Sequence, residues 1–342
     1  MISIDNIEKE LKSGKLQSLY LLYGEELFLL ESALKKIKTL FGECIKGINY
    51  INIDETNYGE LIADIETPSF GYNKKLIIAR NTGLFQKEGK RKNTEIQKNK
   101  EKIKSYIEEN IDIIRDSVVL VFVEDEADAK QELYTTIDKL GVVCKFDFQK
   151  PAQIAKRIKG ICNAYNVQID DNTLQYFIEC CGTNMQDLIN EIRKLIEYAG
   201  DGEKIKKEDI DKLSIKKLES VIFDLTDNLG KKDISKSLEV LKNLIYSKEP
   251  IQKILITLYN HFKKLYFVKI AIRNNKDIIS SLNLKPNQTF LVNKYKVQAN
   301  YFNEKELRNI LQELIDLDYN YKNGIIDLQV GMEAILCRYC GK

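Results

Sequence analysis

The residues best placed to do chemistry are Gly24, Glu25 and Glu26, which follow the apolar run Leu19–Tyr23 and precede an amphipathic pattern. A strand, a glycine turn and a helix N-terminus form the place where nucleotide-binding domains hold phosphates. A working phosphate loop has the pattern G-x-x-x-x-G-K-[ST], whose amides, lysine and hydroxyl bind the phosphates and Mg²⁺. Here two carboxylates occupy the turn, and they suit the helix dipole but repel a triphosphate. We therefore expect a degenerate nucleotide turn.

A second acidic segment, Glu124–Glu126, follows the apolar run VVLVFV at residues 118–123. In ATPases an acidic residue at such a strand end holds Mg²⁺ and helps to orient water. Without a phosphate loop these carboxylates have no ligand, and carboxylates at strand ends are ordinarily exposed. We expect a vestigial or solvated acidic turn.

Other catalytic groups are scarce, because the chain has one histidine and no tryptophan. His261 lies in the amphipathic segment LYNHFKKLY, which favours a structural or surface role over general base catalysis. Cys162, Cys180 and Cys181 fall in apolar helical patterns and are expected to be reduced core residues. Cys337 and Cys340 share one helix face without a second pair, which favours packing over a metal or redox site. No metal or cofactor is expected.

The segment ETPSFGYNKK contains an aromatic residue at a predicted corner between a helix and a strand. Pro68 cannot easily continue the helix and Gly71 frees the turn, so Phe70 is presented at the corner. Phe70 either folds back into the core or forms an exposed anchor for a partner, and the residues leave both readings open. An anchor of this kind contributes about 2 kcal/mol or more on truncation to alanine, or at least about thirtyfold in affinity.

Two features are compatible with nucleic acid. The run from Lys87 to Lys104 is rich in lysine, and Lys90, Arg91 and Lys92 could contact a phosphate backbone. Glutamates dilute this run, which favours a solvated loop and helix face. Tyr321, with Tyr319, could stack on an unpaired base, although tyrosines at helical spacing more often pack in a core.

The elements that position these residues alternate between strand and helix over residues 1–149. The predicted strands are Leu19–Tyr23, Tyr50–Ile53, Lys75–Ala79, Val118–Val123 and Val142–Lys145. The helical patterns between them are Leu27–Leu40, Tyr58–Glu66, Asn99–Glu108 and Lys130–Leu140. This alternation predicts an α/β domain with a doubly wound parallel sheet.

The strand signal ends at Pro151, and residues 150–213 and 214–342 predict a small helical domain followed by an all-helical one. The charge is balanced, with 53 basic and 51 acidic residues, which excludes a globally basic coat for nucleic acid. The polar N-terminus does not look like a signal peptide, and no segment approaches the length of a membrane span. We expect a cytoplasmic protein with no membrane partner.

Four segments together resemble a known family: YLLYGEELFLLE, TPSFGYNKKLIIAR, CGTNMQDLINEIRKLIEYAG and KYKVQANYFNEKELRNILQELIDLDYNYKNGIID. In their order and spacing they are similar, essentially end to end, to delta subunits of the bacterial DNA polymerase III clamp loader. The resemblance implies an AAA+-like α/β domain over residues 1–149, a helical lid over 150–213 and a helical collar over 214–342. It also implies a subunit that binds the sliding clamp (beta) and helps to open it without hydrolysing ATP.

The resemblance further implies partners and site residues. The partners are the motor (gamma/tau) and delta-prime subunits and, in the assembled ring, primer-template DNA within the DNA polymerase III holoenzyme. Phe70 corresponds to the aromatic residue that inserts into the clamp, with Pro68 beside it. Ser69 stands where the family commonly has a large aliphatic residue, which leaves more of the contact to Phe70. An active AAA+ ATPase with a divergent nucleotide site and a helical DNA-binding module remain the alternatives.

Overall fold

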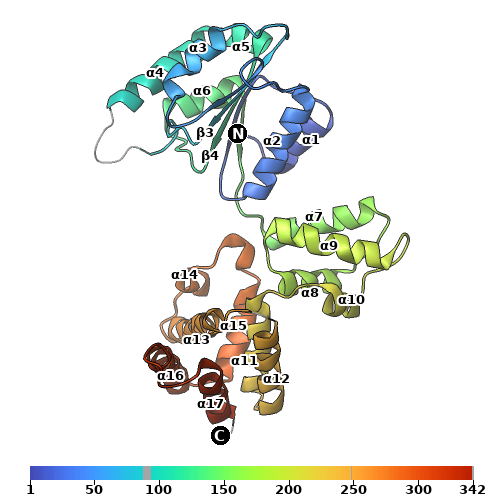
Figure 1. Ribbon diagram of the computed structural model, residues 1–342, viewed down its shortest axis with the longest axis vertical. Helices are drawn as coiled ribbons and strands as arrows, with labels where there is room; N and C mark the ends of the chain where they lie inside the picture. The colour runs from blue at the N-terminus through green and yellow to red at the C-terminus, as the bar shows by residue number, and fades with distance from the viewer. Residues whose placement is uncertain (88–93, 248, 341–342) are drawn as a thin grey trace. The chain divides into compact units, whose positions relative to one another are not determined.

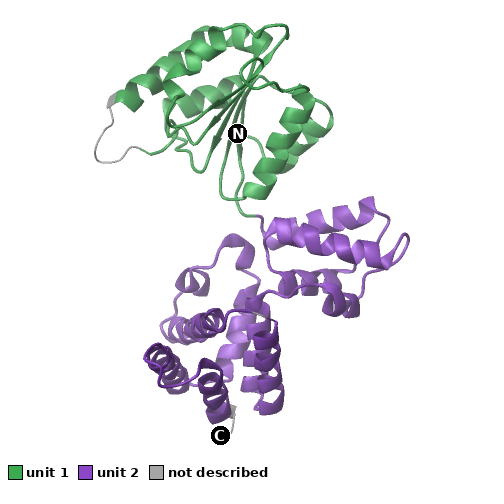
Figure 2. Ribbon diagram, viewed as in Figure 1, with its two compact units in different colours: residues 1–148 green, residues 149–342 purple. Residues whose placement is uncertain are grey.

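The computed structural model describes residues 1–87, 94–247 and 249–340. The chain divides into two compact units, residues 1–148 and residues 149–342, which Figure 2 shows in green and purple. The boundary lies one residue from the predicted end of the α/β domain at residue 149. The further division of the second unit at residue 213 stays a prediction.

The first unit is built on a five-stranded parallel sheet with the strand order β2-β3-β4-β1-β5. The strands are β1 (Leu19–Tyr23), β2 (Tyr50–Ile53), β3 (Lys75–Arg80), β4 (Val118–Glu124) and β5 (Val142–Lys145). Every residue of β1 and β4 is buried, as near-continuous apolar runs predict for strands covered on both faces. The predicted strands are confirmed, and β3 and β4 each extend one residue further than expected.

Helices cover both faces of this sheet (Figure 1). They are α1 (Ile4–Lys12), α2 (Leu27–Phe41), α3 (Leu61–Glu66), α4 (Thr94–Glu109), α5 (Ile111–Ser117) and α6 (Glu132–Leu140), with a 3-10 helix η1 (Tyr58–Glu60) before α3. Successive strand residues alternate between two cores, so that Leu22 packs with α1 and α2 while Leu21 packs with α3 to α6. The doubly wound α/β fold is therefore confirmed.

Both edges of the sheet are short and meet one bridging residue each. The edge strands β2 and β5 contain four residues apiece. Ile2 bridges to Cys144 beside β5, and its amide donates to the carbonyl of Val143 at 2.8 Å. Lys46 bridges to Tyr50 at the start of β2. Each edge strand is thus partly covered by a neighbouring segment.

The second unit is helical throughout its described residues, apart from an isolated bridge between Gln168 and Lys204. Its first helices are α7 (Pro151–Ala164), α8 (Asp171–Cys181), α9 (Met185–Ala199) and α10 (Lys207–Leu213). Asn184 caps α9, because its side chain accepts a hydrogen bond from the amide of Asp187 at 3.0 Å.

The remaining helices share one apolar core. They are α11 (Leu218–Gly230), α12 (Ile234–Tyr246), α13 (Ile251–Arg273), α14 (Ile278–Leu282), α15 (Leu291–Asn300), α16 (Glu304–Lys322) and α17 (Leu328–Cys340), with a 3-10 helix η2 (Pro286–Gln288). The long helix α13 contributes eight buried residues to this core or its margin. α13 spans 23 residues and α16 spans 19, so the predicted all-helical region contains long helices.

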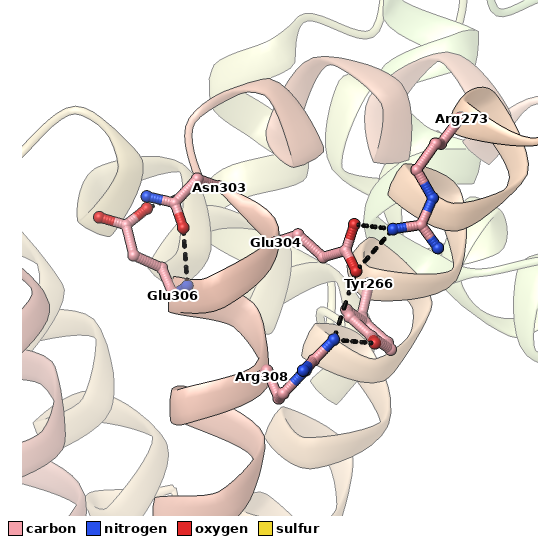
Figure 3. A network of polar contacts seen from close by, with 6 residues as sticks. All are labelled: Tyr266, Arg273, Asn303, Glu304, Glu306 and Arg308. Atoms are coloured by element: carbon pink, nitrogen blue, oxygen red, sulfur yellow. Dashed lines mark hydrogen bonds and ion pairs between the residues drawn. The ribbon is translucent and has the colours of Figure 1, made fainter.

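Polar contacts at the start of α16 fix its position against α13 (Figure 3). The side chain of Asn303 accepts from the amide of Glu306 at 2.8 Å, and the carboxylate of Glu306 accepts from the amide of Asn303 at 2.8 Å. This reciprocal pair is a capping box. Arg273 on α13 donates from Nη1 to both carboxylate oxygens of Glu304, at 3.0 and 2.7 Å. Exposed ion pairs of this kind add little to the free energy of folding. This pair instead marks which residues of α13 and α16 lie opposite each other.

Candidate functional site

The corner between α3 and β3 projects a single aromatic side chain. The amide of Tyr72 donates to the carbonyl of Ser69 at 3.4 Å, which closes a four-residue turn. Gly71, the third residue of that turn, has a φ of 78°. A type II turn requires positive φ at this position, and glycine adopts it without strain. Phe70 is the second residue and lies at the tip of the turn.

Phe70 is 89% exposed, more than any other large hydrophobic residue in the part of the chain that the structure describes. The two readings that the sequence left open are thus resolved in favour of an exposed aromatic. Pro68 is also exposed. Ser69 is half-buried, and its hydroxyl donates to the carbonyl of Tyr72 at 2.6 Å. The serine therefore closes the turn, and the apolar surface comes from Phe70 and Pro68.

The base of this turn is tied to the segment before β2. The hydroxyl of Tyr72 donates to the carboxylate of Glu43 at 3.1 Å. The buried Asn49 holds that segment in place, because its Nδ2 donates to the carbonyl of Glu43 at 2.8 Å and its Oδ1 accepts from the amide of Ile45 at 2.7 Å. The exposed Phe70 thus stands on a hydrogen-bonded base.

The Gly24 turn, which begins at the carboxyl end of β1, is closed by the chain that follows β5. The amide of Gly24 donates to the carbonyl of Glu124 at 3.3 Å, and the amide of Glu26 donates to the carbonyl of Phe146 at 2.8 Å. Gly24 has a φ of 129°, and a Cβ placed there would lie 2.4 Å from the oxygen of Phe146. Glu25 is exposed and Glu26 is buried. The amides of Gly24 and Glu26, which in a phosphate loop would face a ligand, here face protein carbonyls.

The acidic turn at residues 124–126 is predicted to be vestigial or solvated, and the solvated reading is wrong for Glu124. Its side chain is buried and accepts from the amide of Thr82 at 3.0 Å and from the hydroxyl of Thr82 at 2.6 Å. Burial raises the pKa of this carboxyl, while the hydrogen bonds from Thr82 and Gly83 oppose the shift. Glu124 therefore joins the end of β4 to the loop after β3. Asp125 and Glu126 are not buried, as expected.

The structure describes only some of the residues proposed for DNA contact. Tyr321 is half-buried against the core of the second unit, and its hydroxyl accepts from Nε2 of Gln252 at 2.9 Å. Lys90, Arg91 and Lys92 lie outside the described residues. Lys104, the last lysine of that run, is paired with Glu132. DNA contact by these residues stays a prediction.

The histidine and the buried cysteines belong to the core. Nε2 of His261 lies 2.7 Å from Oε1 of Gln298, and burial lowers the pKa of the imidazole to about 4. Cys162, Cys180 and Cys181 are free and buried as predicted, whereas Cys337 is exposed. Among the described residues, no group of three or more His, Cys, Asp or Glu side chains is placed to hold a metal ion. None of the helices in those ranges is long and apolar enough to cross a membrane.

Two family models match the chain. The model described as DNA polymerase III, delta subunit, matches residues 20–147. The model described as DNA polymerase III delta subunit, C-terminal domain, matches residues 219–339. The first contains the Gly24 turn and the Phe70 corner, and the second contains α13, α16 and Tyr321. Together the two models account for most of the chain.

Individual relatives agree with this result along nearly the whole sequence. The chain is 26% identical over 337 residues to the DNA polymerase III subunit delta of Bacillus subtilis, covering 97% of this chain and 95% of the relative. It is 27% identical over 317 residues to the probable DNA polymerase III subunit delta of Aquifex aeolicus, covering 88% and 85%. Its fold matches the solved Bacillus subtilis DNA clamp loader delta protein with a TM-score of 0.75 at 23% identity, covering 99% and 100%.

Proposed function

The chain belongs to the family of DNA polymerase III delta subunits, which are clamp-loader components with a role in DNA replication, and from this premise we propose that it binds the sliding clamp through the Phe70 corner. Binding at this corner helps to hold the clamp open for loading at primer-template junctions. The role places the chain in the cytoplasm, together with the motor (gamma/tau) and delta-prime subunits of the loader.

The observation that carries the proposal is the 89% exposure of Phe70 at the tip of a fixed turn. Moving a phenylalanine side chain from water into an apolar pocket contributes about 1.5 to 3 kcal/mol. Interfaces concentrate their binding energy in a few such anchors, which are enriched in aromatic side chains. Since no described residue of its own unit covers Phe70, this side chain is available to a pocket on a partner, with Pro68 as the adjoining apolar contact.

Opening follows from a difference in affinity. A ligand shifts an equilibrium between two conformations only by as much as it binds one of them more tightly than the other. We propose that the clamp pocket accepts Phe70 better in the open ring than in the closed ring. The energy for the cycle comes from ATP hydrolysed in neighbouring subunits. The Gly24 turn supports this division, because two of its amides donate to the carbonyls of Glu124 and Phe146.

The proposal is tested by measuring clamp binding of the full chain and of Phe70→Ala by surface plasmon resonance. We expect the substitution to weaken binding at least about thirtyfold, as loss of an anchor worth about 2 kcal/mol predicts. Ile113→Ala on α5 is the matched control, because Ile113 is an exposed hydrophobic residue of the same unit at 52% exposure. The control should bind normally. Equal affinities for the wild type and Phe70→Ala would refute the site.

Folding and assembly of the variant are checked separately. Because Phe70 is almost fully exposed, its removal should leave the free energy of unfolding within about 0.5 kcal/mol of the wild type. The variant should also co-elute with the motor and delta-prime subunits in size-exclusion chromatography, since the proposed ring contacts come from residues 214–342. A loss of ring assembly in Phe70→Ala would count against a role confined to the clamp.

A further inference from the structure

The helix that leads into the Phe70 corner is short and loses a hydrogen-bond donor at its end. α3 has six residues, which is too few to be stable without support from its surroundings. In a continuing helix the amide of residue 68 would donate to the carbonyl of Asp64. Proline has no amide hydrogen, so Pro68 leaves that carbonyl without its helical donor. The amide and hydroxyl of Thr67 both donate to Ala63, at 3.0 and 2.7 Å, and do not supply it.

Lys75 supplies the missing donor from the neighbouring strand. Its Nζ donates to the carbonyl of Asp64 at 2.7 Å and also to the carbonyl of Thr67. Lys75 is the first residue of β3, where it pairs with Val118, and it is only 2% exposed. An ammonium group is stabilised near a helix C-terminus, where the backbone carbonyls carry partial negative charge. The Lys75 side chain thus joins the start of β3 to Asp64 within α3 and to Thr67 just after it.

A buried lysine in this place has no ordinary packing explanation. Burying an ammonium group is costly unless it is hydrogen-bonded or paired, and lysines are almost never fully buried. Burial lowers the pKa of the Lys75 amine, and the nearby Asp64 opposes this shift. Lys74, the residue before it, follows the ordinary pattern, because it is half-buried and its Nζ donates to the carbonyl of Arg115 at 2.6 Å. The two adjacent lysines therefore differ in burial and in the backbone carbonyls that they contact.

We propose that Lys75 is a positioning residue that holds the end of α3 against β3, so that the Phe70 turn is presented in one orientation. Between Thr67, which Lys75 holds, and the start of β3, the turn has little freedom to reorient. A partner that binds a preordered turn does not have to order it, which lowers the cost of association. The consequence for the clamp rests on the proposed function, whereas the ordering of the corner can be measured without any partner.

The absence of tryptophan from the chain gives a direct probe of this corner. Phe70→Trp places a single tryptophan at the tip of the turn, and with excitation at wavelengths that the tyrosines do not absorb its fluorescence anisotropy reports how freely the corner moves. We expect Lys75→Met in this background to lower the anisotropy, because methionine keeps the length of the buried stem but donates no hydrogen bond. Lys74→Met should leave it unchanged. Equal anisotropy in the two lysine variants would overturn the inference.

Clamp-binding kinetics separate positioning from contact. If only part of the population presents the turn correctly, the association rate falls by that fraction while the dissociation rate is unaffected. We expect Lys75→Met, in the chain with Phe70 intact, to lower the association rate about tenfold, whereas Phe70→Ala raises the dissociation rate. A change confined to the dissociation rate in Lys75→Met would overturn the positioning role. Normal clamp binding by Phe70→Ala would instead refute the proposed function and leave the anisotropy result standing.

The unaltered chain provides a test that does not depend on the folding of any variant. The amides of Thr67 and Tyr72 donate to Ala63 and Ser69, so a fixed corner should protect both of them from hydrogen exchange. We expect both amides to exchange more slowly than those of an unstructured peptide. Exchange of both at the unstructured rate would overturn the inference whatever the behaviour of Lys75→Met.

Discussion

The Gly24 turn and the Phe70 corner lie at opposite ends of the strands of the same parallel sheet, and their surroundings are opposite as well. Gly24 follows the carboxyl end of β1, is buried, and leaves no room for a methyl group beside Phe146. Gly71 precedes the amino end of β3, is exposed, and has open space for 4 Å around the position that a methyl group would take. One turn is closed by its own unit, and the other holds an apolar side chain out to solvent.

The difference concerns which end of the strands leaves groups open to solvent. In parallel α/β sheets ligands ordinarily bind outside the carboxyl ends of the strands. Here the amides of the turn after β1 donate to protein carbonyls, while the exposed side chain of Phe70 lies before the amino end of β3. The same sheet supports both turns, and the difference between them lies in the chemistry of the turns and not in the fold.

The largest expected effect separates the two glycines. Gly24→Ala combines a φ of 129° with a contact of 2.4 Å to a backbone oxygen, and we expect a loss of about 3 kcal/mol or more in the free energy of unfolding. Gly71→Ala meets only the backbone penalty of positive φ, and we expect a loss of about 1 kcal/mol. Urea unfolding followed by circular dichroism measures both. Equal losses would show that the two turns are not differently packed.

A smaller effect concerns the buried carboxylate of Glu124 at the end of β4. The pKa of Glu124 is raised in the folded state above its ordinary value of 4.5, so the folded chain binds this proton more readily than the unfolded chain. The stability from this group is therefore complete below pH 4.5 and is lost as pH rises through the folded pKa. Glu124→Gln removes the titration but keeps an oxygen acceptor for Thr82.

We accordingly expect the unfolding free energy of the wild type to fall, relative to Glu124→Gln, as pH rises above 4.5. Unfolding curves collected across this pH range measure the difference between the two proteins. Asp125→Asn controls for the loss of one negative charge, since Asp125 is exposed. Parallel stability profiles for the wild type and Glu124→Gln would mean that Glu124 is solvated after all.

The smallest expected effect is the response to nucleotide. Because the amides of Gly24 and Glu26 already donate to carbonyls, a fluorescent ATP analogue should show no saturable binding to the isolated chain below about 1 mM. Equilibrium anisotropy titration with Mg²⁺ present makes this measurement. Micromolar affinity for the analogue would contradict the view that the Gly24 turn is closed. It would favour the alternative of an active ATPase with a divergent site.

The sequence predicts the sheet well because its strands are apolar runs bounded by polar residues. Three of the strands have their predicted bounds, since the pattern in each run depends only on local composition. Short helices are harder to predict: α5 directly precedes β4, so its apolar residues merge with those of the strand and no separate helix is expected there. α4 begins at Thr94 and not at Asn99 because polar residues give its first turn no helical period.

The site is only partly predictable. The sequence places Phe70 at a corner. Its exposure depends on whether a segment distant in the chain covers it, and the local sequence pattern carries no information about such contacts. The burial of Glu124 escapes prediction because its partner, Thr82, lies 42 residues away in the chain. Lys75 escapes it for a similar reason, since its role depends on a carbonyl that Pro68 has left without a donor. A proline at the end of a short helix, followed by a lysine that opens a strand, is the signal that could have found it.

The bridges at Ile2 and Lys46 bear on how the isolated chain behaves at high concentration. Free strand edges and exposed aromatic side chains are both routes to self-association, and proteins limit the first by keeping edge strands short or covered. In this chain both edge strands are four residues long and meet a bridging residue. The edge strands of the first unit are therefore a weaker route to self-association than long uncovered strands would be.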